Sequence, residues 1–129
     1  MSEKFKVEII SPDRLVLKKE AREVSLPCYE GEMGILKDHI SLITFLRPGF
    51  IKIFNEKVDE FFVEEGTVEF TNNNLLILTS SAIRPSEIDK KSLNNLIFES
   101  EKKINNNETS DKERYLESYK IESLKSINQ

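Results

Sequence analysis

The sequence predicts an antiparallel β-sandwich of short strands followed by an α-helical hairpin. Before about residue 85, apolar and polar side chains alternate with a period of two, which is typical of half-buried strands. After Pro85, glycine and proline are absent and the apolar side chains recur at helical spacing. We therefore expect a β-sandwich over residues 1–85 and a helix-turn-helix tail over residues 86–129, the tail being a candidate for a mobile element.

The strands are predicted by alternation and separated by turn residues. The alternating segments read FKVEII, REVSL, DEFFVEEGTVEF and NLLILTS. Their breaks carry proline, glycine, asparagine or aspartate at residues 11–14, 47–49, 54–57 and 72–74. Short strands at intervals of about ten residues indicate a sandwich or barrel.

The tail reads as two helices joined by the polar turn NNNETSD. We expect Ser86 to cap the first helix and Ser110 or Asp111 to cap the second. The first helix carries a thin apolar stripe made of Leu93, Leu96, Ile97 and Ile104. The second places four apolar side chains roughly on one face: Tyr115, Leu116, Tyr119 and Leu124. A stripe this thin predicts weak docking of the tail.

Composition excludes several classes of protein. The net charge of −4 argues against a nucleic-acid binder, which needs a basic surface for phosphates. A single cysteine, Cys28, excludes an internal disulfide framework and a multi-thiolate zinc site. No run approaches the roughly 20 apolar residues that span a bilayer, so we expect no direct membrane insertion. The N-terminus also lacks the apolar core of a signal peptide, which predicts a cytoplasmic location.

The segment EGEMGILKDHISL, residues 30–42, holds the only histidine and two of the four glycines. A catalytic His39 oriented by Asp38 or Glu32 would need a nucleophile or metal partners, and the chain offers neither. The spacing of Gly31 and Gly34 lacks the Gly-Lys-Ser/Thr of a phosphate-binding loop and indicates a turn with positive φ. The residues therefore predict no catalytic or metal site and no cofactor, and favour an interaction protein.

Residues 24–53, VSLPCYEGEMGILKDHISLITFLRPGFIKI, closely resemble the epsilon subunit family of the rotary proton-translocating (F-type) ATP synthase. That family typically carries V-x-x-P/T-x-x-x-G-E/D-x-G-I/V-L/Y-x-x-H-x-P-L-L-T-x-L-x-P-G-x-x-x-I. The matching residues are Gly31, Glu32, Gly34, Ile35, Leu36, His39, Leu42, Thr44, Leu46, Pro48, Gly49 and Ile53. The opening hairpin and the junction ILTSSAIRPSEID are also similar to the family pattern, so the resemblance extends over residues 4 to about 90.

The resemblance implies a non-catalytic subunit of the central stalk that binds the gamma subunit and the c-ring. Such a subunit turns with the rotor and couples proton flow to ATP synthesis, as a peripheral protein on the cytoplasmic face of the bacterial inner membrane. The implied interface residues are Gly31, Glu32, Gly34, His39, Leu42 and Thr44. Glu32 would face the polar loops of the c-ring, and His39 and Thr44 would face the stalk.

The resemblance also assigns a role to the tail. In the family the hairpin can detach, contact the α/β catalytic head and block ATP hydrolysis. Some members bind ATP through I/L-D-x-x-R-A, of which Ile88 and Asp89 remain here, while Ser92 and Leu93 replace the arginine and alanine. Without that guanidinium a main phosphate partner is missing. Two alternatives stay open: a free-standing β-sandwich adaptor for an unrelated protein, and an enzyme centred on His39 and Glu32.

Overall fold

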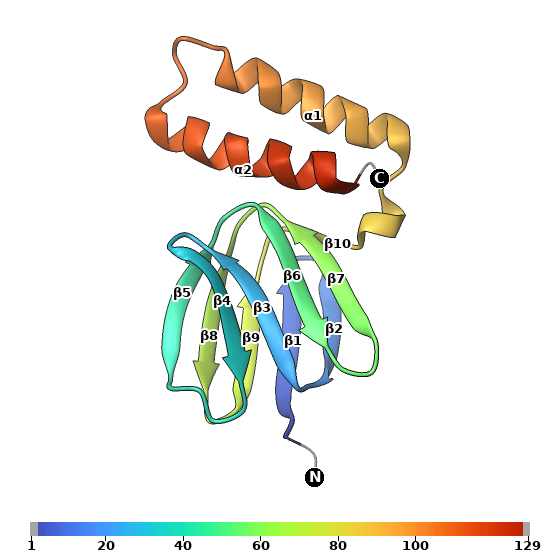
Figure 1. The fold of residues 1–129 in the computed structure, drawn as a ribbon, viewed down its shortest axis with the longest axis vertical. Coiled ribbons are helices and arrows are strands. Elements are labelled where there is room, and N and C mark those ends of the chain that lie inside the picture. The colour runs from blue at the N-terminus through green and yellow to red at the C-terminus, as the bar shows by residue number, and fades with distance from the viewer. Residues whose placement is uncertain (1–2, 128–129) are drawn as a thin grey trace.

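The computed structural model describes residues 3–127; residues 1–2 and 128–129, the outer ends of the two predicted regions, lie outside the described part. Figure 1 shows a β-sandwich with a pair of antiparallel helices across one of its ends. The strands are β1 (Phe5–Ser11), β2 (Arg14–Ala21), β3 (Glu23–Cys28), β4 (Gly31–Leu36), β5 (Leu42–Leu46), β6 (Gly49–Phe54), β7 (Val58–Val63), β8 (Gly66–Thr71), β9 (Asn74–Leu78) and β10 (Ala82–Ile83). A 3-10 turn (Pro85–Glu87) leads to α1 (Lys90–Ile104) and α2 (Asp111–Ile127).

The strands form one folded sheet in the order β10-β7-β6-β3-β5-β8-β9-β1-β2. The remaining strand, β4, also pairs with β3. Strands β10, β7, β6, β3 and β4 make one layer, and β5, β8, β9, β1 and β2 make the other. Between β3 and β5 the layers are joined by the pairing of Cys28 with Leu46. The predicted fold class is confirmed, with one difference: β1 pairs with β9 in parallel. No hairpin constrains this pair, because the two strands lie at opposite ends of the sandwich sequence.

The turns form where the sequence carries turn chemistry. Asn72 and Asn73 connect β8 to β9 with φ values of 50° and 59°. Two successive residues with positive φ are what a two-residue hairpin turn of the right twist requires, and asparagine tolerates this conformation better than most residues. The predicted breaks at residues 11–14, 47–49 and 54–57 likewise fall between strands.

Alternation along the strands builds the core of the sandwich. In β1, Phe5, Val7 and Ile9 are buried, and Lys6 points outward. The same period places buried side chains from both layers into a single apolar cluster: Phe5, Val7, Ile9, Ala21, Val24, Leu26, Cys28, Ile35, Leu46, Ile51, Ile53, Phe61, Val63, Val68, Phe70, Leu75, Ile77 and Ala82. Close packing of this kind makes the sandwich a stiff body.

The first helix begins later than predicted. Ser86 lies inside the 3-10 turn, and Asp89 caps α1 instead, its carboxylate accepting a hydrogen bond of 2.7 Å from the Ser92 amide. The prediction of Ser86 was wrong because Pro85 starts a separate turn, held by a 3.0 Å bond from the Arg84 amide to Glu87 Oε1. For α2 the alternatives resolve to Ser110, whose hydroxyl accepts from the Glu113 amide at 3.1 Å.

The hairpin packs against the end of the sandwich through a second, smaller cluster. Phe62, Leu93 and Leu124 are its buried members, with Phe50, Ile88, Leu96, Ile97 and Ile127 around them. Polar contacts flank it: Lys120 Nζ lies 2.7 Å from Glu64 Oε1, and the Lys120 side chain is only 11% exposed. Tyr115 donates a 3.2 Å hydrogen bond to the Tyr29 carbonyl oxygen. Within residues 3–127, neither helix is long and apolar enough to cross a membrane.

Candidate docking surface

A row of mainly apolar side chains crosses the outer face of the layer β5-β8-β9-β1-β2. The strand register pairs Phe45 with Thr67, Thr67 with Leu78, Leu78 with Ile10, and Ile10 with Leu15. Residues directly opposite on neighbouring strands point to the same face of a sheet. We call these five side chains the apolar row.

Three of the five side chains of the apolar row are exposed to solvent, and Ile10 and Thr67 are half-buried. Phe45 is 54% exposed, Leu15 51% and Leu78 46%, and Ile43, on the same face of β5, is 68% exposed. A sheet of which one face packs on the core usually turns polar side chains outward on the other face. Contiguous apolar surface in a monomer marks a place where another molecule binds. The outer face of this layer is therefore apolar along one row, whereas the next row, through Ile43, also carries Glu69, Glu8 and Lys18.

The predicted residues Leu42 and Thr44 lie on the inner face of β5. Leu42 packs against the core, and Thr44 is half-buried next to Cys28. Burial raises the pKa of the Cys28 thiol, and the Thr44 hydroxyl opposes part of that rise. Leu42 and Thr44 thus lie on the face of β5 that packs toward the core, and the neighbouring Ile43 and Phe45 lie on the opposite, exposed face.

His39 is a half-buried loop residue. Its Nδ1 lies 2.8 Å from the Ile40 carbonyl oxygen, to which it donates as the Nδ1–H tautomer. The ring packs edge-on against Phe70, with 5.9 Å between ring centroids. Over residues 3–127 there is no group of three histidine, cysteine or carboxylate side chains placed to hold a metal ion. These contacts agree with His39 acting in the packing of the loop.

Gly31 and Gly34 do not form one turn. Gly31 has a φ of +130° in the tight turn between β3 and β4, which confirms the prediction of a residue needing positive φ. Gly34 lies inside β4, paired with Ser25, so the prediction was wrong for this residue. Glu32 is exposed on the same strand, and its carboxylate accepts a weak 3.5 Å contact from the Ser25 hydroxyl.

Glu32 and His39 lie toward opposite ends of the sandwich. Glu32 is near the start of β4, at the end covered by the helices, and His39 follows the other end of that strand (Figure 1). A six-residue strand spans about 20 Å, at about 3.3 Å per residue. The two side chains therefore do not converge, and Glu32 does not orient His39 as a general base.

Ile88 and Asp89 have structural roles at the start of α1. Ile88 packs at the edge of the small cluster between the hairpin and the sandwich. The Asp89 carboxylate is occupied as the cap of α1, and its hydrogen bond from the Ser92 amide lowers its pKa. The residue that the resemblance associates with a phosphate contact is Ser92, whose amide makes the cap.

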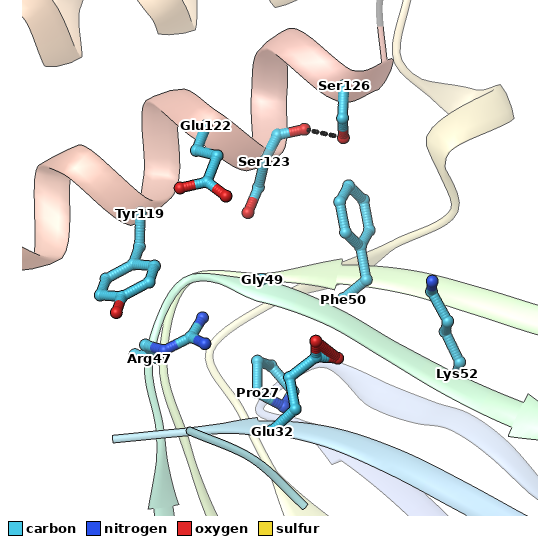
Figure 2. Close-up of a pocket in the computed structure, with 10 residues that line it drawn as sticks. All are labelled: Pro27, Glu32, Arg47, Gly49, Phe50, Lys52, Tyr119, Glu122, Ser123 and Ser126. Carbon is cyan, nitrogen blue, oxygen red and sulfur yellow. Dashed lines mark hydrogen bonds between the residues drawn. The ribbon is translucent and has the colours of Figure 1, made fainter. Parts of the chain in front are cut away.

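A cavity of about 250 Å³ lies between the sandwich and α2 (Figure 2). Arg47 reaches it from below, its guanidinium carbon 3.8 Å from the centre of the Tyr119 ring. Arg47 Nε is buried without a hydrogen-bond partner among the described residues. Glu32, Lys52 and Glu122 also line the cavity, so both signs of charge face it. The hairpin thus rests on the sandwich with an incompletely filled, polar gap beneath it.

Comparison with known proteins identifies the family. The family model of the ATP synthase delta/epsilon chain β-sandwich domain matches residues 4–85. The ATP synthase epsilon chain of Pelagibacter ubique (strain HTCC1062) is 49% identical over 130 residues, covering 99% of this chain and 100% of the relative. The chain belongs to the ATP synthase epsilon chain family. The epsilon chain of Hydrogenobaculum sp. (strain Y04AAS1) is 30% identical over 107 residues, covering 83% of this chain and 79% of that one.

Solved structures share the fold of this epsilon chain. A chain of the Euglena gracilis mitochondrial ATP synthase superposes with a TM-score of 0.80 at 20% identity, covering 100% of this chain and 84% of that one. A chain of the Tetrahymena thermophila mitochondrial ATP synthase central stalk and c-ring gives a TM-score of 0.65 at 13% identity, covering 96% of each. These matches extend over both the sandwich and the hairpin.

Membership of the family confirms the resemblance stated for residues 24–53. As an epsilon chain, the protein is a non-catalytic subunit of the central stalk of an F-type ATP synthase. The alternative of an enzyme centred on His39 and Glu32 was wrong. Its two named residues are separated by the length of β4 and have other contacts.

The exposed residues Ile43 and Phe45 were missed in the sequence analysis. The segment LITFL is apolar at almost every position, so alternation gives no contrast between its two faces. A usable signal was present, because a strand that is apolar in both phases is typical of a sheet covered on both faces. That pattern predicts a partner on the outer face, which Leu42 and Thr44 cannot reach.

Proposed function

We propose that this epsilon chain binds the gamma subunit through the apolar row and Ile43, and rests on the c-ring through the exposed edge around Glu32. In this position it turns with the rotor and couples proton translocation to ATP synthesis at the cytoplasmic face of the bacterial inner membrane. The observation that carries the proposal is the group of exposed apolar side chains on the outer face of a close-packed sandwich, in the apolar row and at Ile43. Torque passes without slippage only through a body that deforms little, and close-packed layers deform little.

The predicted interface residues divide into two sets under this proposal. Gly31, Glu32 and Gly34 belong to β4, where a carboxylate is exposed to meet basic side chains of the c-ring. His39, Leu42 and Thr44 support the gamma-facing surface from within, while Ile43 and Phe45 make the contact. Large apolar side chains at the centre of an interface carry most of the binding energy.

The test is binding of the cognate gamma subunit to variants of the full chain. We expect Phe45→Ser to weaken binding about 10- to 30-fold, because truncating a central aromatic residue costs about 2 kcal/mol. The matched control is Val58→Ser, which removes an apolar side chain that is 55% exposed on β7 of the other layer. Thermal unfolding of both variants checks that the sandwich stays folded.

Equal affinity of Phe45→Ser, Val58→Ser and the unchanged chain would contradict the proposed surface. Failure of the unchanged chain to bind gamma at all would favour the alternative, a free-standing adaptor for an unrelated protein.

We further propose that the sandwich and the hairpin act as separate units, and that the hairpin detaches to contact the α/β catalytic head and restrain ATP hydrolysis. The small docking cluster supports this, because such a switch requires a gap of only a few kcal/mol between states. The test is deletion of the residues after Pro85 followed by measurement of ATP hydrolysis in the assembled enzyme. Faster hydrolysis is expected; an unchanged rate would count against the switch.

A further inference from the structure

Two loops at the end of the sandwich remote from the hairpin are joined by a reciprocal pair of side chains. The Asp38 amide donates to Asn73 Oδ1 at 2.7 Å, and Asn73 Nδ2 donates to Asp38 Oδ1 at 3.0 Å. Asp38 belongs to the β4–β5 loop and Asn73 to the β8–β9 turn, 35 positions apart in the sequence. We call this pair the loop clasp.

Both members of the loop clasp have left-handed backbone conformations. Asp38 has a φ of 67° and Asn73 a φ of 59°. Each residue in this region costs about 1 kcal/mol relative to ordinary backbone, and asparagine and aspartate tolerate it because their side chains bond locally. Here the side chains bond to each other, so each loop holds the other in its uncommon conformation. Paired outliers of this kind are a reason to look for a function nearby.

The loop clasp lies beside Ile40, the most exposed large apolar residue among residues 3–127. Ile40, two positions after Asp38, is 78% exposed. It precedes Ser41, which with Ile43, Glu69 and Thr71 lines a shallow hollow of about 410 Å³ at the end of β5 and β8. The Ser41 hydroxyl reaches the Thr71 hydroxyl at 3.4 Å and closes one wall of this hollow.

Further contacts tie the loop to the sandwich. The His39 amide donates to the Leu36 carbonyl oxygen at 3.1 Å, and the His39 ring packs on Phe70 of β8. The Lys6 amide donates to the Asn73 carbonyl oxygen at 3.0 Å, which anchors the turn to β1. The loop clasp is the link between these two anchored segments. The conformation of the loop is therefore set before any partner arrives.

We propose that Asp38 and Asn73 are positioning residues for binding of the gamma subunit. This inference rests on the proposed function and extends its surface from the apolar row to Ile40 and the hollow beside it. The loop clasp holds Ile40 and the wall at Ser41 in their binding conformation. Gamma then binds without losing the conformational freedom of a mobile loop, which is how preorganisation raises affinity.

The test compares two glycine variants in the same turn of the full chain. Asn73→Gly keeps the positive φ and removes the loop clasp. Asn72→Gly is the matched control, because Asn72 also has positive φ, at 50°, and its side chain makes no hydrogen bond among the described residues. Amide exchange by NMR on the isolated chain reports the loop, and titration with the cognate gamma subunit reports binding.

We expect Asn73→Gly to accelerate exchange of the Asp38 amide at least tenfold and to weaken gamma binding about three- to tenfold, the range for ordering one or two side chains or loop residues. Asn72→Gly leaves both quantities unchanged. Asp38→Gly weakens binding too, and the double variant with Asn73→Gly loses no more than the worse single variant, because both changes break one interaction.

Two results would overturn the inference: unchanged exchange of the Asp38 amide in Asn73→Gly, or accelerated exchange with gamma affinity equal to that of Asn72→Gly. The second result leaves the proposed function intact if Phe45→Ser still weakens binding. If Phe45→Ser also binds gamma normally, the proposed surface itself fails.

Discussion

The sandwich and the hairpin docking interface bury apolar side chains on different scales. The sandwich core contains 18 buried residues in one cluster, and the cluster beneath the hairpin contains three. Each fully buried aliphatic or aromatic side chain contributes about 1.5–3 kcal/mol. The hairpin is therefore held by a few kcal/mol after the entropy of ordering is subtracted. One chain thus combines a stiff body with an element that is weakly held.

The kind of contact also differs between the two regions. The sandwich core is almost entirely apolar, whereas the hairpin is located by Lys120 on Glu64, Tyr119 on Arg47 and Tyr115 on the Tyr29 carbonyl. Polar contacts of this kind add little net stability, since water replaces them when they open. They do specify one docked position. The interface can therefore be reproducible without being strong.

The largest effect is expected in the sandwich core. Phe70→Ala should lower the free energy of unfolding by about 3–5 kcal/mol, because it leaves a cavity beneath β8 where Phe5 now packs at 5.6 Å between ring centroids. Urea unfolding measures the change. The control, Phe98→Ala on α1, removes a ring that is 59% exposed and should change stability by less than about 0.5 kcal/mol. Similar losses in both variants would contradict the contrast between core and tail.

Leu124→Ala is expected to release the hairpin without unfolding the sandwich. Leu124 is fully buried in the small cluster, so its truncation should weaken docking by about 2–4 kcal/mol. Since the docking energy is itself only a few kcal/mol, α2 should release while the sandwich unfolds at its original urea midpoint. Hydrogen exchange of the α2 amides measures release. The control is Ile121→Ala on α2, a half-buried residue that lines a hollow with α1 residues such as Phe98 and Lys102. A matching drop in the sandwich midpoint would show that the two parts unfold as one.

The ion pair of the docking interface predicts an asymmetry. Glu64→Ala leaves the Lys120 ammonium without a carboxylate in a site where that side chain is 11% exposed, and should weaken docking by about 1–2 kcal/mol. Lys120→Met should cost less than about 1 kcal/mol, because it keeps the apolar stem and leaves a Glu64 side chain that is 46% exposed and hydrated. Exchange of the α2 amides ranks the two variants. The reverse order would contradict this account.

The smallest effect comes from Asp59, a β7 residue that pairs with Lys19 and with Arg84, just before the tail. Hydrogen bonds from Lys19 and Arg84 lower the pKa of its carboxyl. A depressed folded-state pKa adds stability above the unfolded value of about 3.9, and that stability is lost as pH falls through the folded pKa. Asp59→Asn should therefore cost about 1 kcal/mol at neutral pH, and the difference should vanish in acid.

Unfolding midpoints measured across pH test the Asp59 prediction. The control is Asp13→Asn in the exposed β1–β2 turn, whose carboxylate makes no ion pair among residues 3–127. A difference between Asp59→Asn and the unchanged chain that does not shrink as pH falls below the unfolded value would contradict the assigned cause.

The sequence predicts what local chemistry determines. The alternating segments correctly indicate β1, β3, β7, β8 and β9, and the loss of glycine and proline after Pro85 correctly indicates the change from strands to helices. It does not predict the parallel pairing of β1 with β9, because that depends on segments about 65 positions apart meeting in space. The cap at Asp89 in place of Ser86 was missed because Pro85 starts a separate short turn.

The sequence does not predict which residues of β5 are exposed. The resemblance to the family selects Leu42 and Thr44 as interface residues, which stays a prediction, and a strand that is apolar in both phases does not reveal which side faces the core. The loop clasp was likewise invisible, since Asp38 and Asn73 carry no local sign of each other. Their two hydrogen bonds and their shared left-handed backbone conformation are seen only in three dimensions.

The burial of Cys28 at the junction of the two layers has a practical consequence for labelling the protein with thiol-reactive dyes. The thiol is 1% exposed where β3 meets β5, and burial raises its pKa, so little thiolate exists at neutral pH to meet an alkylating reagent. Cysteines introduced on the hairpin and on an exposed loop of the sandwich can therefore carry a donor and an acceptor dye with the native thiol left in place. The distance between them can be followed in single molecules of otherwise natural sequence.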